Sequence, residues 1–96
     1  MTIPRGRDAA VTLSALAEMN GCSRREVEAF IQQARLNGTA LITGNEGVWR
    51  AETPQEARDM ANRLRSRAIH QMETAQALER AADAMTVSQE EFPWAA

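Results

Sequence analysis

Apolar positions divide the first third of the chain into two short helical stretches. Leu13, Leu16 and Ala17 have the spacing of one helical face, and Thr12 before them belongs to a residue type that caps helix starts. We therefore predict a first helix over residues 12–19.

A second helix is predicted after the break at residues 20–22. Residues 23–26 read Ser-Arg-Arg-Glu, a capping box in which the serine hydroxyl accepts a hydrogen bond from the third helical amide and the glutamate reaches back. Apolar side chains then recur at i, i+3, i+4 and i+7, namely Val27, Phe30, Ile31 and Ala34. Asn-Gly at 37–38 is a typical helix stop. We predict a helix over residues 23–36 whose other face is exposed.

Two short β-rich stretches come next, at residues 40–43 and 48–51. They flank Gly44-Asn45-Glu46-Gly47, a four-residue loop whose terminal glycines permit positive φ, so we predict a β-hairpin. A hairpin this short needs support from the rest of the fold, and Trp49 is expected to anchor one face in the core. Arg50 would then point to the opposite face and remain available.

The rest of the chain predicts one long helix. Thr53-Pro54-Gln55-Glu56 is a second capping box with proline at the first helical position, and no further Gly or Pro occurs before Pro93. A helix over residues 54–86 would be on the order of 50 Å long.

Alanine recurs every seventh residue of this helix, mostly with a large apolar residue three positions later, which favours close helix pairing. We predict a homodimer interface with these residues: Ala61, Leu64, Ala68, Met72, Ala75, Leu78, Ala82 and Met85. The alternative is that the helix folds back, or breaks near Gln71, so that one chain buries its own stripe.

Together these elements predict a mainly α fold with a small β-hairpin. A winged helix-turn-helix module would occupy residues 1–52, a long C-terminal helix residues 53–86, and a flexible tail residues 87–96. In winged helix-turn-helix proteins the second helix lies in the DNA major groove and the wing contacts the phosphate backbone. The candidate DNA-contacting residues are Ser23, Arg24, Arg25, Glu28, Gln32 and Arg35 on the second helix, and Asn45 and Arg50 on the wing. Arg5 and Arg7 are expected on an N-terminal arm that could reach a neighbouring groove or the DNA backbone.

The opening Ile3-Pro4-Arg5-Gly6-Arg7 strengthens this interpretation, together with Gly-Cys-Ser-Arg-Arg-Glu-Val at 21–27, Gly-Val-Trp at 47–49 and Leu-Arg-Ser-Arg-Ala at 64–68. Over about residues 3–82 the chain resembles a family of small phage or prophage winged-helix proteins. The resemblance implies a phage origin and binding of double-stranded DNA. Relatives in that family have Asn where Ala9 or Ala10 stands here, so the role of that side chain does not carry over.

Charge and composition narrow the function further. Hydrophobic residues make up 44% of the 96-residue chain and charged residues 25%, which is typical of a globular domain. The net charge is −2, with +1 over residues 1–50 and −3 over residues 51–96, so the amino half is the better candidate for binding phosphate. The single cysteine, Cys22, cannot form an internal disulfide, which favours a reducing compartment such as the cytoplasm.

The sequence contains no recognisable catalytic or metal-binding pattern. His70 and Cys22 lack partners at catalytic or metal-ligand spacing, and no glycine-rich phosphate loop is present. We therefore expect neither an enzyme nor a cofactor. The favoured function is a DNA-binding transcriptional regulator or replication accessory. The alternative is a winged-helix module that binds a host or phage protein instead of DNA.

Overall fold

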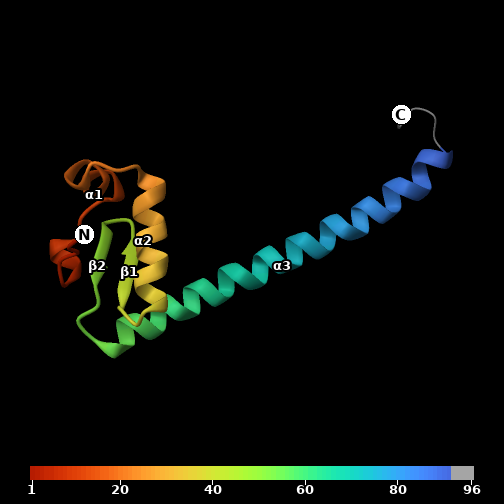
Figure 1. Cartoon of the computed structure of the whole chain (residues 1–96). Coiled ribbons are helices and arrows are strands. Elements are labelled where there is room, and N and C mark those ends of the chain that lie inside the picture. Colours follow the sequence, from red (N-terminus) through yellow and green to blue (C-terminus); the bar gives the residue numbers. More distant parts are fainter. Residues whose placement is uncertain (92–96) are drawn as a thin grey trace. The chain divides into compact units, whose positions relative to one another are not determined.

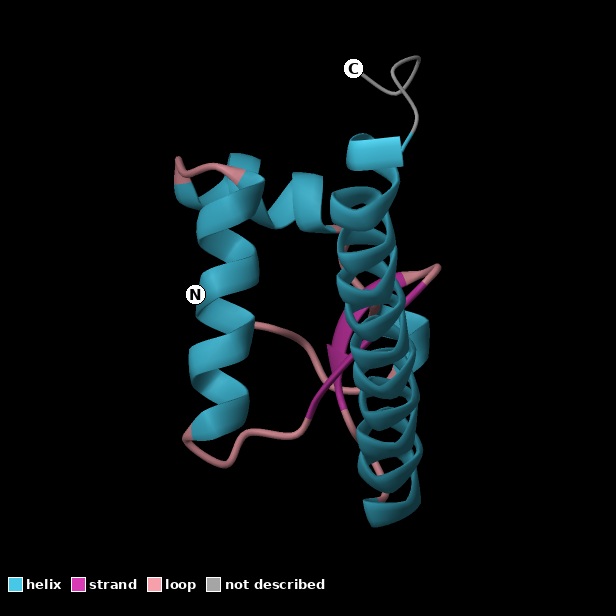
Figure 2. Cartoon of the chain, turned by 90° about the vertical axis from the view of Figure 1, so that its right-hand side faces the viewer, coloured by secondary structure: helices cyan, strands magenta, loops and turns pink. Residues whose placement is uncertain are grey.

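The computed structural model describes the backbone of residues 1–91 and the side chains of residues 1–86. The fold is mainly helical with one β-hairpin, as predicted (Figure 2). Contacts divide the chain into two compact units, Met1–Ala61, here called the winged module, and the part from Asn62 onward. The elements in chain order are a 3-10 turn η1 (Arg7–Ala9), α1 (Leu13–Asn20), α2 (Arg24–Leu36), β1 (Leu41–Gly44), β2 (Gly47–Arg50) and α3 (Pro54–Glu91) (Figure 1).

Both predicted helix starts in the first third of the chain are confirmed. The Thr12 side chain accepts a hydrogen bond from the Ala15 amide at 3.1 Å, which caps α1. Gly21 ends that helix in the left-handed conformation at φ 62°, a geometry that glycine adopts without strain. Ser23 caps α2 by accepting from the Glu26 amide at 3.1 Å. The result is the predicted order of helix, short turn and helix.

The hairpin forms with a tighter turn than predicted. β1 and β2 pair antiparallel from Leu41 opposite Arg50 to Gly44 opposite Gly47, so both glycines belong to the ladder. The turn itself is therefore the pair Asn45-Glu46. Of the two glycines, Gly47 has positive φ, 121°, and its close approach to the Val11 carbonyl leaves no space for a Cβ atom.

The N-terminal segment lies along the other edge of β2. The Arg50 amide donates to the Pro4 carbonyl at 2.8 Å, and the Gly6 amide donates to the Arg50 carbonyl at 2.9 Å. Val11 and Val48 exchange two further backbone hydrogen bonds, at 2.9 and 3.1 Å. These backbone bonds attach the N-terminal segment to the hairpin, so Arg5 and Arg7 lie on a paired segment rather than on a projecting arm.

Both faces of the hairpin are buried, where one was predicted. One face packs on α1, α2 and the N-terminal segment, with these buried residues: Ile3, Leu16, Ala17, Val27, Ile31, Leu41 and Val48. The other face forms a second cluster of Ile42, Trp49 and Met60, in which Met60 comes from the start of α3. Trp49 is 1% exposed, which confirms it as the anchor of the hairpin. The first turns of α3 are therefore part of the winged module.

The start of α3 is fixed to the hairpin through Glu56. The Glu56 amide donates to the Thr53 hydroxyl at 3.3 Å, as the second capping box predicts. The Glu56 carboxylate accepts from the Glu52 amide at 3.3 Å and from the Trp49 indole nitrogen at 3.4 Å. This carboxylate therefore supplies the hydrogen-bond partner that the buried indole needs.

Beyond Ala61, α3 continues without interruption. It is helical through Gln71, so the predicted alternative of a break there is wrong, and it extends to Glu91, past the predicted end at 86. The remainder of the predicted tail, residues 92–96, lies outside the described residues. Every residue from Asn62 to Thr86, a segment called here the distal helix, is exposed. In the described part of the chain, no helix combines the length and apolarity needed to cross a membrane.

Candidate nucleic-acid interface

The outer face of α2 presents a group of polar side chains to solvent. Arg24, Arg25, Glu28 and Gln32 are exposed, whereas Val27 and Ile31 on the opposite face are buried in the core. The capping box and the apolar spacing predicted this division, and it is confirmed. Guanidinium and amide groups are the side-chain types that form paired hydrogen bonds with base edges in a major groove. The exposed face of α2 therefore carries side chains of the types that can hydrogen-bond to base edges.

Arg35 does not belong to that face. Its side chain is half-buried, with Nε donating to the Leu41 carbonyl at 3.0 Å and a terminal nitrogen donating to the Thr43 hydroxyl at 3.1 Å. The prediction that Arg35 is available to a partner is wrong. The chain reverses direction between α2 and β1, which brings the last turn of α2 beside the strand (Figure 1). Arg35 connects these two elements.

The Ser23 hydroxyl is also engaged within the protein. Besides accepting from the Glu26 amide, it donates to the Glu26 carboxylate at 3.3 Å. The carboxylate thus contacts the capping hydroxyl rather than the capping backbone amide that the motif predicts. Ser23 is exposed, but its first role in the fold is to start α2.

The wing carries mixed charge. Asn45 is exposed at the turn with the acidic Glu46 beside it, and Arg50 is exposed at the end of β2. The exposure of Arg50 agrees with the prediction for its side chain, and its contact with a partner stays a prediction. The backbone of Arg50 is paired on both edges, since its strand lies between β1 and the N-terminal segment.

Arg5 and Arg7 lie on the segment that pairs with the hairpin. A terminal nitrogen of Arg5 is 3.4 Å from the Glu52 carbonyl. The Arg7 guanidinium lies 5.3 Å from the centre of the Trp49 ring and 3.9 Å from a Glu46 carboxylate oxygen. The distance to the ring is within the range of a cation–π contact. Arg7 therefore covers the outer side of the tryptophan, although its own side chain is 65% exposed.

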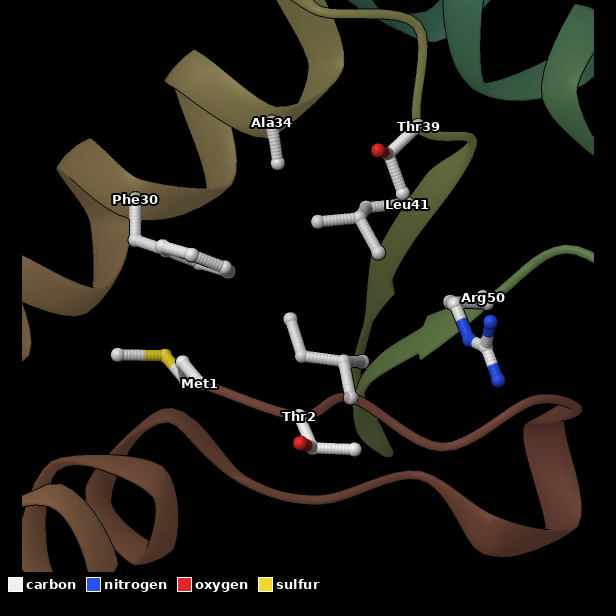
Figure 3. A pocket seen from close by; sticks show the side chains of 8 residues that line it. Met1, Thr2, Phe30, Ala34, Thr39, Leu41 and Arg50 are labelled. Atoms are coloured by element: carbon white, nitrogen blue, oxygen red, sulfur yellow. The ribbon is translucent and has the colours of Figure 1, made fainter.

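A pocket of about 290 Å³ with a mixed polar and apolar lining lies between the N-terminal segment, α2 and the hairpin. Phe30 and Ala34 from α2, Leu41 from β1 and Met1 face this space, and Arg50 lies at its side (Figure 3). Phe30 and Ala34 are therefore half-buried instead of fully enclosed. The helical spacing placed both side chains on the core face, but it carried no signal that the N-terminal segment would cover them incompletely.

The residues predicted for a dimer interface extend from the edge of the winged module along the distal helix. Ala61 is half-buried, and the other seven are exposed within the single chain: Leu64, Ala68, Met72, Ala75, Leu78, Ala82 and Met85. Leu64 is 38% exposed, Met72 61%, Met85 59% and Leu78 66%. These side chains form an apolar stripe that no other part of the described chain covers.

The remaining ionisable side chains of the described residues form no metal-binding group. No set of three or more His, Cys, Asp or Glu side chains there is arranged to hold a metal ion. The imidazole Nδ1 of His70 lies 3.7 Å from a Glu73 carboxylate oxygen, and both side chains are largely exposed. Cys22 is half-buried in the turn between α1 and α2.

Comparisons of the chain with family models, with curated proteins and with solved structures find no match. A function for the chain therefore rests on its own geometry and chemistry.

Proposed function

We propose that the chain is a DNA-binding winged helix-turn-helix protein of the phage type, acting as a transcriptional regulator or replication accessory. The observation that carries this proposal is the outer face of α2. Arg24 and Arg25 are exposed in its first turn and Gln32 lies two turns later, while the opposite face holds the core. In chain order α2 follows α1 and a short turn, which is where helix-turn-helix proteins have their recognition helix.

Binding to double-stranded DNA can be tested with labelled duplexes at several salt concentrations. A protein that binds phosphates releases counterions, so its affinity must fall as salt rises. A preferred sequence is then obtained by repeated selection from a random duplex library. Arg25→Ala is expected to weaken binding to that sequence by about 1–3 kcal/mol if the side chain reads a guanine.

Arg80→Ala is the matched control for that substitution. Arg80 is exposed on the distal helix, and its replacement changes the net charge by the same amount. The control should leave binding to the preferred sequence within about twofold, because Arg80 lies outside the face of α2 proposed to contact bases and an exposed charge without a direct contact is screened by salt. An equal loss for both variants would show a general charge effect and contradict base reading by Arg25.

We further propose that the protein acts as a homodimer held together by α3. The support is the apolar stripe of the distal helix, which would otherwise remain in contact with water. Replacing Ala75 and Leu78 with Glu introduces four negative charges into each paired interface. Sedimentation should show a wild-type dimer and a monomeric variant at tens of micromolar; a monomeric wild type, or a dimer that tolerates both charges, contradicts the proposal.

A second function is favoured by the distribution of acids on the winged module. Glu26 and Glu28 are exposed on α2 and Glu46 is exposed at the wing turn, and each would repel phosphate. These residues support a module that binds a protein with a basic surface. The salt titration separates the two functions, because such a module would show no binding to any duplex even at low salt.

A further inference from the structure

We propose that two copies of α3 pair antiparallel, centred near Glu73, so that the two winged modules are attached at opposite ends of the pair. The inference rests on the proposed homodimer and adds its orientation and register. It starts from the sequence pattern of the stripe and the exposure of its side chains, which leave this face of the helix open to a second copy.

The spacing of small and large residues fits an antiparallel register. The stripe has a seven-residue repeat, with an alanine at one position and a mostly large residue three positions later. When two such helices pair antiparallel, the alanine position of one helix lies opposite the large-residue position of the other. Aligning Ala68 with the partner's Leu78 also aligns Ala82 with the partner's Leu64. The same register places Ala61 opposite the partner's Met85. These layers combine a small and a large side chain, which fills the space between two closely spaced helices.

A parallel pair would combine the same residues less well. Each alanine would lie opposite the same alanine of the other copy, and each leucine opposite the same leucine. At any one distance between the helices, the alanine layers would then leave gaps or the leucine layers would be overpacked. Gaps and overpacked contacts both weaken an interface.

Charge along the distal helix favours the same orientation. Residues 62–72 contain three arginines and no acid, whereas residues 73–86 contain Glu73, Glu79 and Asp83 with one arginine. In the antiparallel register, Arg65 lies beside the partner's Glu79, and symmetry repeats this pair. A parallel dimer would instead place the two arginine-rich segments side by side, where like charges repel.

The flanking positions also agree with this register. Met72 lies next to the two-fold axis, so the two methionines would meet there and each cover part of the other. Met72 is 61% exposed in the single chain. In a parallel pair the two methionines would lie on opposite sides of the interface and stay in water.

The orientation determines where the modules are attached. The two Ala61 residues, at which α3 leaves each winged module, would be separated along the pair by about 36 Å at 1.5 Å per residue. A parallel pair would hold both modules at the same end.

Disulfide trapping tests the orientation directly. Full-length Ala68→Cys and Leu78→Cys variants are prepared in a Cys22→Ser background and equilibrated in a glutathione redox buffer, separately and as an equal mixture. A disulfide requires Cα atoms about 4.4–6.8 Å apart. Antiparallel pairing places position 68 of one copy beside position 78 of the other but separates identical positions by about 15 Å along the axis. We expect a covalent dimer of mixed mass, formed in the mixture only.

Two results would overturn the proposal. Disulfides within each variant alone would establish parallel pairing. A mixture without disulfides would show that these positions do not meet. Neither measurement involves DNA, so a failure here leaves the DNA-binding test on Arg25 unaffected, and loss of DNA binding leaves the trapping result unaffected.

Charge exchange gives a second test that does not depend on cysteine. Arg65→Glu and Glu79→Arg should each weaken dimerisation by about three- to tenfold, as expected when exposed ion pairs become like-charge pairs. The variant that carries both changes should regain wild-type affinity, because the pair is restored with reversed sign. A double variant as weak as either single variant would overturn the register.

Discussion

The winged module and the distal helix are built from similar residues but bury them differently. All buried hydrophobic side chains among the described residues lie between Ile3 and Met60. The distal helix has Leu78, Met85 and several alanines on one stripe, yet none of its described residues is buried. Apolar residues at helical spacing therefore identify a face of a helix that is suited to packing. They do not show whether the same chain or a second molecule packs on that face.

The largest effect expected from this difference is that of removing Trp49. Trp49→Ala should lower the free energy of unfolding by about 3–5 kcal/mol, because it leaves a cavity between Ile42 and Met60 and removes the indole partner of Glu56. Urea unfolding followed by circular dichroism measures the loss. Ile69→Ala in the 54% exposed position of the distal helix is the control, and a comparable loss there would contradict the contrast between the two regions.

A smaller loss is expected where the N-terminal segment meets the hairpin. Gly47→Ala should destabilise the module by about 2–3 kcal/mol, because its positive φ is strained for alanine and the new methyl group would clash with the Val11 carbonyl. Gly38→Ala has the same type of backbone conformation, at φ 99°, with open space around it. Denaturant unfolding of both variants separates the clash from the strain, and equal losses would show that the close contact to Val11 is unimportant.

Arg35 gives the next smaller effect. Arg35→Ala should lower the unfolding free energy by about 1–2 kcal/mol, because the Leu41 carbonyl and Thr43 hydroxyl lose a charged donor in a half-buried place. Arg25→Ala, an exposed arginine on the same helix, should change stability by less than about 0.5 kcal/mol. Thermal unfolding of the two variants compares them. Equal stability of both would mean that Arg35 does not hold α2 against β1.

The smallest effect is expected at Arg7. Arg7→Ala should cost about 0.5–1 kcal/mol through loss of the cation–π contact at an exposed site. Arg7→Lys should recover part of that stability, since a lysine ammonium can also lie over the ring. The emission maximum of Trp49 can be followed in a Trp94→Phe background; an identical spectrum in all three proteins would argue against a contact between Arg7 and the indole.

Local signals in the sequence predicted the helices and the hairpin well. The capping residues Thr12, Ser23 and Thr53 were identified from their own types and from the residues directly after them, and all three cap as predicted. Helix starts can be recognised because the interactions that define them span only a few residues. The exposed and buried faces of α2 could be predicted from spacing for the same reason.

Long-range pairings were the part that local patterns missed. The attachment of residues 4–11 to β2 depends on backbone hydrogen bonds, which carry no side-chain pattern. The second buried face of the hairpin requires Met60, a residue of α3 that no local pattern connects to the hairpin. Arg35 was assigned to the outer face because helical spacing places it away from the apolar positions of α2. That spacing takes no account of β1, which lies beside Arg35 in the fold.

The continuity of α3 across the end of the winged module affects how the distal helix forms. An isolated helix must first organise one turn at an unfavourable nucleation step before it can extend. Here the first two turns, Pro54 to Met60, are held by the Thr53 cap and by the burial of Met60. A folded module thus supplies the nucleus, and the distal helix forms by propagation alone, so a peptide that starts at Asn62 would be less helical than the same residues in the intact chain.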